Sequence, residues 1–172
     1  MAIGLLTLVL ACTSNQSLQE YYVAHSENPN FISFDIPASI LNLEEAALTP
    51  TQRDAVSSLR KLNILAFKRT AENATDYQVE KANVKAILAH DEYTELMKIK
   101  TDFGKATVRY LGEEDAIEEV IMYGDNDEKG FALVRILGNN MNPAHFVQLL
   151  QALQQSDFDG QALGELGDLF KS

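Results

Sequence analysis

The only cysteine in the 172-residue chain, Cys12, follows an uncharged apolar run, MAIGLLTLVLA, and precedes a polar string, TSNQS. A lone thiol forms no intramolecular disulfide, so its chemistry must be read from its surroundings. Two interpretations compete. Cys12 is either a buried free cysteine at the end of an apolar strand or an attachment point at which the mature protein begins. The abrupt change from apolar to polar residues favours attachment.

Residues Val9 to Cys12 resemble a bacterial lipobox, with an aliphatic residue three positions before the cysteine and a small residue directly before it. Residues 1–11 are too few to span a bilayer, but they have the length of the apolar core of a signal peptide. The resemblance implies cleavage between Ala11 and Cys12, a diacylglycerol on the Cys12 sulfur, and acylation of the new amine, for example by palmitate. The segment departs from the signal-peptide pattern in one respect, because its n-region contains no Lys or Arg.

Lipidation would determine where the protein works. Each buried methylene contributes about 0.8 kcal/mol, so two or three acyl chains anchor a protein almost permanently. The residue after the cysteine is Thr13 rather than aspartate, which by the same resemblance favours the outer membrane. We therefore expect a protein of the cell envelope that residues 12–17 tether to the outer membrane, with its domain facing the periplasm.

Two charged residues, Asp35 and Arg135, stand inside otherwise apolar stretches that have the pattern of strands. Successive side chains of a strand point to opposite faces of the sheet, so the simplest expectation places both residues on a solvent-facing side. The alternative is that they face a ligand or form a buried ion pair. They are the candidate ligand-binding residues of the sequence.

Other reactive residue types form no recognisable site. The three histidines fall on different predicted helices, and their spacing predicts no metal site: His25, His90 and His145. The sequence contains no G-x-S-x-G motif, no Walker A sequence and no dinucleotide-binding fingerprint. We therefore expect no enzymatic activity and no cofactor.

A cluster of acidic residues begins at Glu113 and continues to Glu119. It predicts a solvated turn that leads into an edge strand, where charge prevents pairing with other chains. Loose binding of a divalent cation is the alternative. The members of the cluster are Glu113, Glu114, Asp115, Glu118 and Glu119.

The overall composition indicates one globular domain. The chain is 46% hydrophobic, which is enough for a core, and its formal net charge is −11. This negative charge repels nucleic acids and anionic lipid headgroups, so neither is expected as a partner.

Hydrophobic periodicity and helix-start signals predict the order of the elements. Capping boxes begin three of the helices, at Ser17, Thr49 and Thr75. Helices are expected over residues 17–28, 49–61 and 75–90 and from 142 onward, with a short helix or turn over 92–98. Strands are expected over 31–37, 63–69, 105–111, 116–123 and 130–137.

These elements predict an α+β fold with a mixed, mainly antiparallel five-stranded sheet in the order β-α-β-α-β-β-β-α. A right-handed crossover would make the first two strands parallel, and the last three strands would form an antiparallel meander. Helices would cover mostly one face of the sheet. The single domain is expected over residues 18–155, with a weakly helical tail over 156–172.

Several stretches together resemble a known family. They are SLQEYYVAHSENPNFISFDIPASIL, LNILAFK, YQVEKANVKAIL, YTELMKIK and GFALVRILGNNMNP. In this order they resemble the domain of unknown function 4252 family of Bacteroidota lipoproteins, in particular its flavobacterial members, over about residues 17–155. The resemblance implies a lipid-anchored α+β domain in a Gram-negative envelope, and it implies no site residues.

The sequence therefore favours a non-enzymatic lipoprotein whose domain binds an envelope protein or senses a signal. The alternative is a small-ligand carrier or hydrolase-like domain with a pocket between sheet and helices, to which Asp35 or Arg135 would contribute. The sequence leaves the oligomeric state open.

Overall fold

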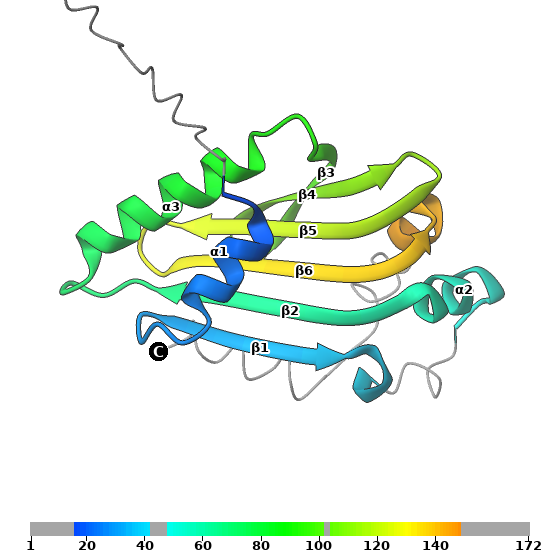
Figure 1. The fold of residues 1–172 in the computed structure, drawn as a ribbon, viewed down its shortest axis with the longest axis horizontal. Helices are drawn as coiled ribbons and strands as arrows, with labels where there is room; N and C mark the ends of the chain where they lie inside the picture. The colour runs from blue at the N-terminus through cyan, green and yellow to red at the C-terminus, as the bar shows by residue number, and fades with distance from the viewer. Residues whose placement is uncertain (1–15, 42–47, 102–103, 149–172) are drawn as a thin grey trace, which may run out of the picture.

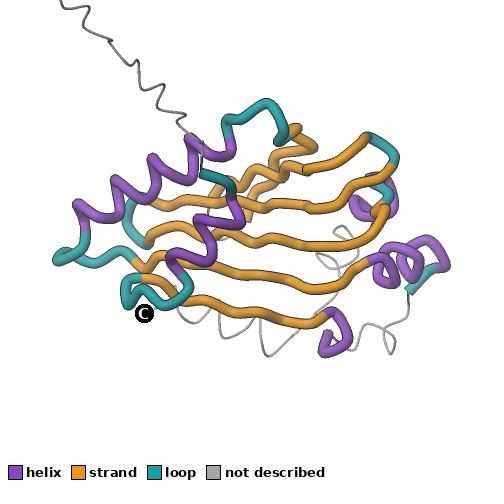
Figure 2. Tube along the Cα trace, viewed as in Figure 1, coloured by secondary structure: helices purple, strands orange, loops and turns teal. Residues whose placement is uncertain are grey.

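The computed structural model describes residues 16–41, 48–101 and 104–148. Within these residues, six strands form one antiparallel sheet in the order β1-β2-β6-β5-β4-β3 (Figures 1 and 2). The α+β class is confirmed, with six strands in place of the expected five.

The helices are α1 (Leu18–His25), α2 (Pro50–Ser58) and α3 (Ala74–Leu88), and a 3-10 turn, η1 (Ala38–Leu41), follows the first strand. The strands are β1 (Phe31–Pro37), β2 (Leu59–Lys68), β3 (Thr94–Thr101), β4 (Gly104–Glu113), β5 (Ala116–Asn126) and β6 (Gly130–Met141). Residues 143–148 are helical and continue from β6.

Two of the three predicted capping boxes are present. Ser17 accepts from the Glu20 backbone N–H at 3.2 Å, and Glu20 accepts from the Ser17 backbone N–H at 2.8 Å. Thr49 and Gln52 form the same reciprocal pair at the start of α2. The box predicted at Thr75 is wrong, because α3 already begins at Ala74 and has no side-chain cap.

The first two strands are antiparallel, not parallel as predicted. Phe31 lies opposite Phe67, and Pro37 lies opposite Lys61. A parallel crossover needs a connection that runs back along the whole length of the sheet. Instead, the nine-residue α2 lies at the end of the sheet where β1 finishes and β2 starts (Figure 1). The chain therefore re-enters the sheet from the same end.

The sixth strand was predicted as a helix or turn over residues 92–98. β3 pairs with β4, but its register shifts between Glu95 and Met97. Such a bulge interrupts the alternation of side chains. The apolar residues Leu96 and Met97 then stand three and four positions after Tyr93, which is the spacing typical of a helix face. The bulge explains why the sequence predicts a helix or turn at these residues.

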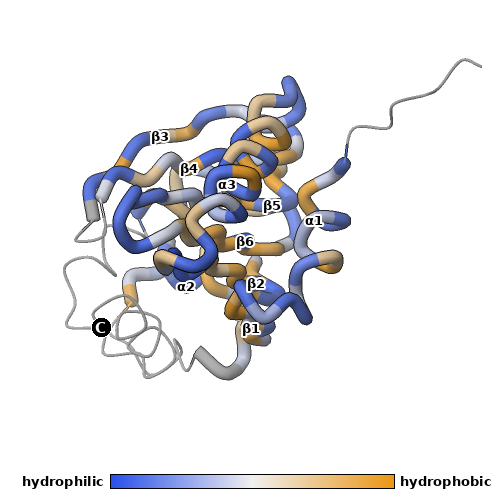
Figure 3. The backbone as a smooth tube through the Cα atoms, turned by 90° about the vertical axis from the view of Figure 1, so that its left-hand side faces the viewer, coloured by the Kyte–Doolittle hydropathy of each residue, from blue (hydrophilic) through white to orange (hydrophobic). Residues whose placement is uncertain are grey.

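Helices α1 and α3 cover the same face of the sheet, as expected, and Figure 1 shows both in front of the strands. Aromatic rings join these helices to β1, β2 and β6; Phe67 stacks on Phe131 with centroids 5.6 Å apart. Figure 3 shows hydrophobic segments gathered in the strands and hydrophilic ones on the outer side of α3. The buried residues of this helix-covered core are Leu18, Tyr21, Tyr22, Phe31, Leu65, Phe67, Tyr77, Val84, Ile87, Leu88, Tyr93, Ile121, Tyr123, Phe131 and Leu133.

The opposite face of the sheet is also apolar. Its fully buried members include Val108, Ile117 and Val120, and Phe146 from the helical residues 143–148 packs with them. Ile32, Phe34 and Ile36 of β1 continue this face to the sheet edge, where they are half-buried. Both faces of the sheet therefore contribute to cores.

Several predictions fall on residues outside the described ranges. They concern the signal peptide over 1–11, the cleavage site at Ala11, lipidation of Cys12, most of the tether over 12–17, and the tail over 156–172. Among the described residues, no helix is long and apolar enough to cross a membrane.

Candidate functional site

A row of polar residues crosses three neighbouring strands beneath α1. Asp35 of β1 lies directly opposite Asn63 of β2, and Asn63 lies opposite Arg135 of β6. Residues directly opposite each other point to the same face of a sheet. The sheet register therefore aligns Asp35 and Arg135 on the helix-covered face, with Asn63 between them.

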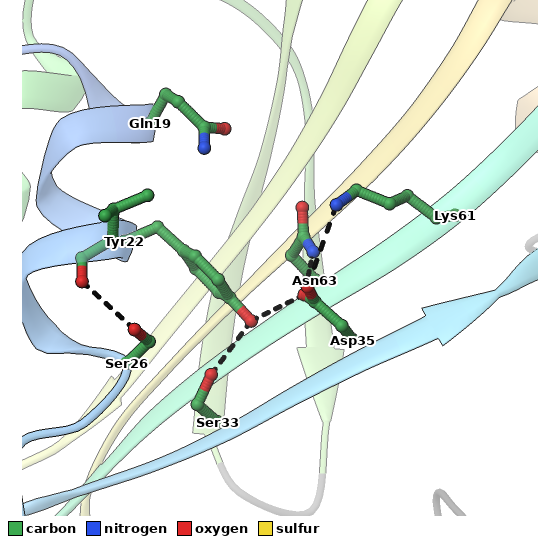
Figure 4. A pocket seen from close by; sticks show the side chains of 8 residues that line it. Gln19, Tyr22, Ser26, Ser33, Asp35, Lys61 and Asn63 are labelled. Atoms are coloured by element: carbon green, nitrogen blue, oxygen red, sulfur yellow. Dashed lines mark hydrogen bonds and ion pairs between the residues drawn. The ribbon is translucent and has the colours of Figure 1, made fainter.

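Asp35 and Asn63 of this row form the floor of a polar groove between α1 and the sheet edge. The groove has a volume of about 360 Å³. Figure 4 shows Tyr22 reaching from α1 toward β1, where Asp35, Asn63 and Lys61 converge. The lining residues are Gln19, Tyr22, Val23 and Ser26 of α1, Ser33 and Asp35 of β1, and Lys61 and Asn63 of β2.

Asp35 is the acceptor at the centre of the groove. Its Oδ1 accepts hydrogen bonds from the Tyr22 hydroxyl at 2.9 Å and from the Asn63 amide. Its Oδ2 faces the Lys61 ammonium at 3.7 Å, and 58% of the Asp35 side chain is exposed. One oxygen thus positions the carboxylate, while the other pairs with Lys61 in a side chain that is still more than half exposed.

Tyr22 connects α1 to the floor of the groove. Its hydroxyl also lies 2.9 Å from Ser33 Oγ. One arrangement of protons fits both contacts, with Ser33 donating to Tyr22 and Tyr22 donating to Asp35. Burial raises the pKa of Tyr22, the Ser33 hydrogen bond opposes this shift, and the nearby Asp35 carboxylate adds to it. The phenol therefore stays protonated and acts as a donor.

Arg135 is buried, and the expectation of a solvent-facing position is wrong for this residue. Only 3% of Arg135 and 6% of Glu119 are exposed. Arg135 donates from Nε and Nη2 to the two Glu119 carboxylate oxygens at 2.6 and 2.8 Å, and from Nη1 to Gln19 Oε1 at 2.6 Å. Its guanidinium carbon lies 5.9 Å from the centre of the Tyr22 ring.

The two candidate residues therefore have different roles. Asp35 lines the groove, whereas Arg135 supports it from below by holding Gln19 and packing against Tyr22. A bidentate arginine–carboxylate pair combines strong hydrogen bonds with fixed geometry. The buried pair accordingly fixes the position of α1 over the sheet, and α1 contributes half of the groove.

The sequence pattern did not indicate the other principal residues of this site: Gln19, Tyr22, Ser33, Lys61, Asn63 and Glu119. Glu119 was assigned to a solvated acidic turn leading into an edge strand, but β5 is an interior strand and Glu119 is buried in it. Glu113, Glu114, Asp115 and Glu118 are exposed, as expected for a turn. The available signal was the position of Glu119 two residues before Ile121, which puts both on one face of a strand, but the adjacent Glu118 concealed it.

The histidines remain separate from the groove. His25 lies between α1 and α3, with Nδ1 2.8 Å from the Tyr21 carbonyl oxygen and Nε2 3.3 Å from a Glu80 carboxylate oxygen. His90 lies 3.9 Å from Glu92, and His145 is in the helical residues 143–148. In the part of the chain that the structure describes, no group of three His, Cys, Asp or Glu side chains is placed to hold a metal ion.

The fold and the groove define an α+β domain in which two helices cover one face of an antiparallel sheet and a polar groove opens beside the β1 edge. A family model described as "Domain of unknown function (DUF4252)" matches residues 21–149, well over half of the chain. The chain belongs to this family, as its sequence resemblance predicted. No curated protein and no solved structure matches it.

Proposed function

We propose that this protein is a lipid-anchored lipoprotein of the cell envelope whose domain recognises a partner protein without catalysing a reaction. The observation that carries the proposal is the open groove beneath α1, in which Tyr22, Asp35 and Asn63 are positioned by one another. Ordered side chains lose little conformational freedom when a partner binds, which favours affinity.

The character of the groove favours a protein partner over a small molecule. Small-ligand sites are usually concave, mostly apolar and able to enclose the ligand. Here the lining is predominantly polar, and it lies at the edge of the sheet, next to an exposed apolar residue, Val23, on α1. A polar surface with one apolar contact at its rim fits the surface of a partner protein.

Charge further restricts the partner. The chain carries a formal net charge of −11, and complementary charge accelerates encounter and selects among partners. Oδ2 of Asp35, which faces the Lys61 ammonium at 3.7 Å, is the acceptor for which a lysine or arginine of the partner would compete. We therefore expect a partner with a basic surface.

The anchor remains part of the proposal. Lipidation of Cys12 would place α1, the first described helix, only a few residues from the outer membrane. A Cys12→Ala variant should lose the acyl adduct in mass spectrometry and should move from the membrane fraction to the soluble fraction. An unchanged membrane fraction would show that the protein is not held by this cysteine.

The groove itself is tested by cross-linked capture from intact cells. We expect a partner to be recovered with the unmodified protein and to be lost with Asp35→Asn, which keeps the shape of the side chain and removes its charge. The matched control is Asp54→Asn, an exposed position on α2 outside the groove. Equal recovery with both variants would contradict recognition through the groove.

The second candidate function is a small-ligand carrier, favoured by the convergence of polar side chains around Asp35. It predicts a different result. A small polar molecule extracted with the purified protein would be lost with Asp35→Asn, while no protein would be captured by cross-linking.

A further inference from the structure

The two edges of the sheet differ in how well they are protected against pairing with other chains. At one edge, β3 contains a bulge between Glu95 and Met97 and presents exposed Lys98 and Lys100. Bulges and lysines are common devices that block edge-to-edge association. The β3 edge is therefore protected against pairing with a strand of another chain.

The opposite edge has few such devices. β1 pairs with β2 over seven residues without a register shift. Its only charged residue is Asp35, and its only proline, Pro37, lies at the very end. No strand among the described residues pairs with the outer side of β1. A regular edge strand without such protection presents backbone N–H and C=O groups with which a further strand can pair.

We propose that β1 pairs antiparallel with β1 of a second copy of this chain, in the register centred on Phe34. In this register Phe34 lies opposite Phe34, Ser33 opposite Asp35, Ile32 opposite Ile36, and Phe31 opposite Pro37. Apolar side chains would meet on one face, and a hydroxyl would meet a carboxylate on the other. The strand is therefore complementary to itself, as a two-fold symmetric contact requires.

Neighbouring registers are less favourable. A shift that changes the face of the side chains would place Phe34 opposite Ser33 or Asp35, and either Ile32 or Ile36 opposite a polar residue. A register centred on Asp35 would place two carboxylates directly opposite each other, which is destabilising. A register centred on Ser33 would leave Ile36 and Pro37 without partners. Only the register centred on Phe34 pairs the whole strand without opposing like charges.

The proposed pairing has a consequence for the groove. The two-fold axis of an antiparallel strand pair is perpendicular to the sheet, so α1 and α3 of both copies would lie on the same side of a twelve-stranded sheet. Each groove would gain Ser33 of the second copy beside its own Asp35. Both copies would also begin α1 on one side, which allows two Cys12 anchors to enter the same membrane.

Single cysteine variants test the register in native membranes, and this test rests on the proposed lipidation, which blocks Cys12. Opposite Cβ atoms of an antiparallel pair are about 5 Å apart, within reach of a disulfide or a short thiol cross-linker. Phe34→Cys should form a covalent dimer in membranes. Ile32→Cys should not dimerise with itself but should cross-link to co-expressed Ile36→Cys. The matched control, Val79→Cys, lies on α3 and is 53% exposed.

The mass of the unmodified protein in detergent provides a measurement that depends on no substitution. We expect a dimer, and we expect Phe34→Lys to convert it to a monomer with an unchanged circular dichroism spectrum, because two ammonium groups would meet at the axis. A monomeric unmodified protein would overturn the proposal. So would a dimer in which Phe34→Cys cross-links no better than Val79→Cys. Asp35→Asn keeps an acceptor for Ser33 of the second copy and should remain a dimer, so loss of partner capture in this variant is distinguished from loss of the dimer.

Discussion

Arg135 makes three hydrogen bonds, two to Glu119 and one to Gln19. Loss of one member of a buried ion pair leaves an unpaired charge in the core and costs about 3–5 kcal/mol. We therefore expect Arg135→Met to lower the free energy of unfolding by about this amount in urea titrations. A change below about 1 kcal/mol, the range of an exposed pair, would contradict a buried pair.

The matched control removes both charges. In Arg135→Met/Glu119→Leu no buried charge is left unpaired, and apolar replacements of buried ion pairs are often neutral or stabilising. The double variant should therefore recover most of the stability lost in the single variant. The hydrogen bond from Arg135 to Gln19 is still absent in the double variant. We therefore expect the double variant to capture less partner than the unmodified protein.

At the residue scale, sequence alone identified Asp35 and Arg135 but not their roles. Each is one charge in an apolar strand, and period-two alternation places such a residue on one face without saying what covers that face. α1 covers Arg135 and leaves Asp35 largely exposed. Burial here depends on contacts between elements that are distant in sequence, which a local pattern does not contain.

The start of α1 is fixed by its own sequence, and this has a measurable effect. Ser17→Ala removes the side chain that accepts from the Glu20 backbone N–H, and loss of such a cap costs about 1 kcal/mol. Thr49→Ala removes the corresponding cap of α2 and should cost a similar amount in urea unfolding. Only Ser17→Ala should weaken partner capture, because α1 lines the groove and α2 does not. Equal capture by the two variants would contradict this.

The β5–β6 hairpin requires glycine at its exit. Gly130 has φ +126°, and a Cβ atom there would overlap the Phe67 carbonyl oxygen. The backbone conformation alone costs a side-chain-bearing residue about 1–3 kcal/mol, so Gly130→Ala should destabilise the protein by at least that amount in thermal or urea unfolding. The control, Gly124→Ala, meets the Ala106 Cβ at 3.4 Å and should be much milder. Equal losses would show that the hairpin tolerates a side chain.

At the element scale, capping residues allowed two helix starts to be predicted, because a cap is a local interaction between residues three apart. The direction of β2 could not be predicted in the same way. It depends on whether α2 crosses the sheet or stays at its end, and α2 has only one buried residue, Ala55. A mostly exposed helix carries little information about where it docks.

At the scale of the whole molecule, buried tyrosines make the fold sensitive to high pH. Five of them have a raised pKa, and burial is the largest cause in each case: Tyr21, Tyr22, Tyr77, Tyr93 and Tyr123. The pKa of Tyr93 is raised to about 12. In the unfolded chain the pKa of tyrosine is about 10. Above that pH the unfolded state loses protons that the folded state keeps, so stability falls as pH rises.

We therefore expect the free energy of unfolding contributed by these phenols to be constant below about pH 10 and to decline between about pH 10 and 12. Urea unfolding across this range measures the decline. Phenolate absorbance provides the control, since the folded protein should ionise at higher pH than the protein in denaturant. Coincident titration curves in the two states would contradict burial of the phenols.

Recognition through the groove beneath α1 is tested most directly by site-specific photo-cross-linking in intact cells. Val23 at the groove and Val79 on α3 are exposed to similar extents, 62% and 53%, so a photoreactive residue at either position is equally free to react. We predict a discrete adduct with a partner protein from position 23, abolished by Asp35→Asn, and none from position 79. Absence of an adduct at position 23, or the same adduct at both positions, would contradict recognition through this groove.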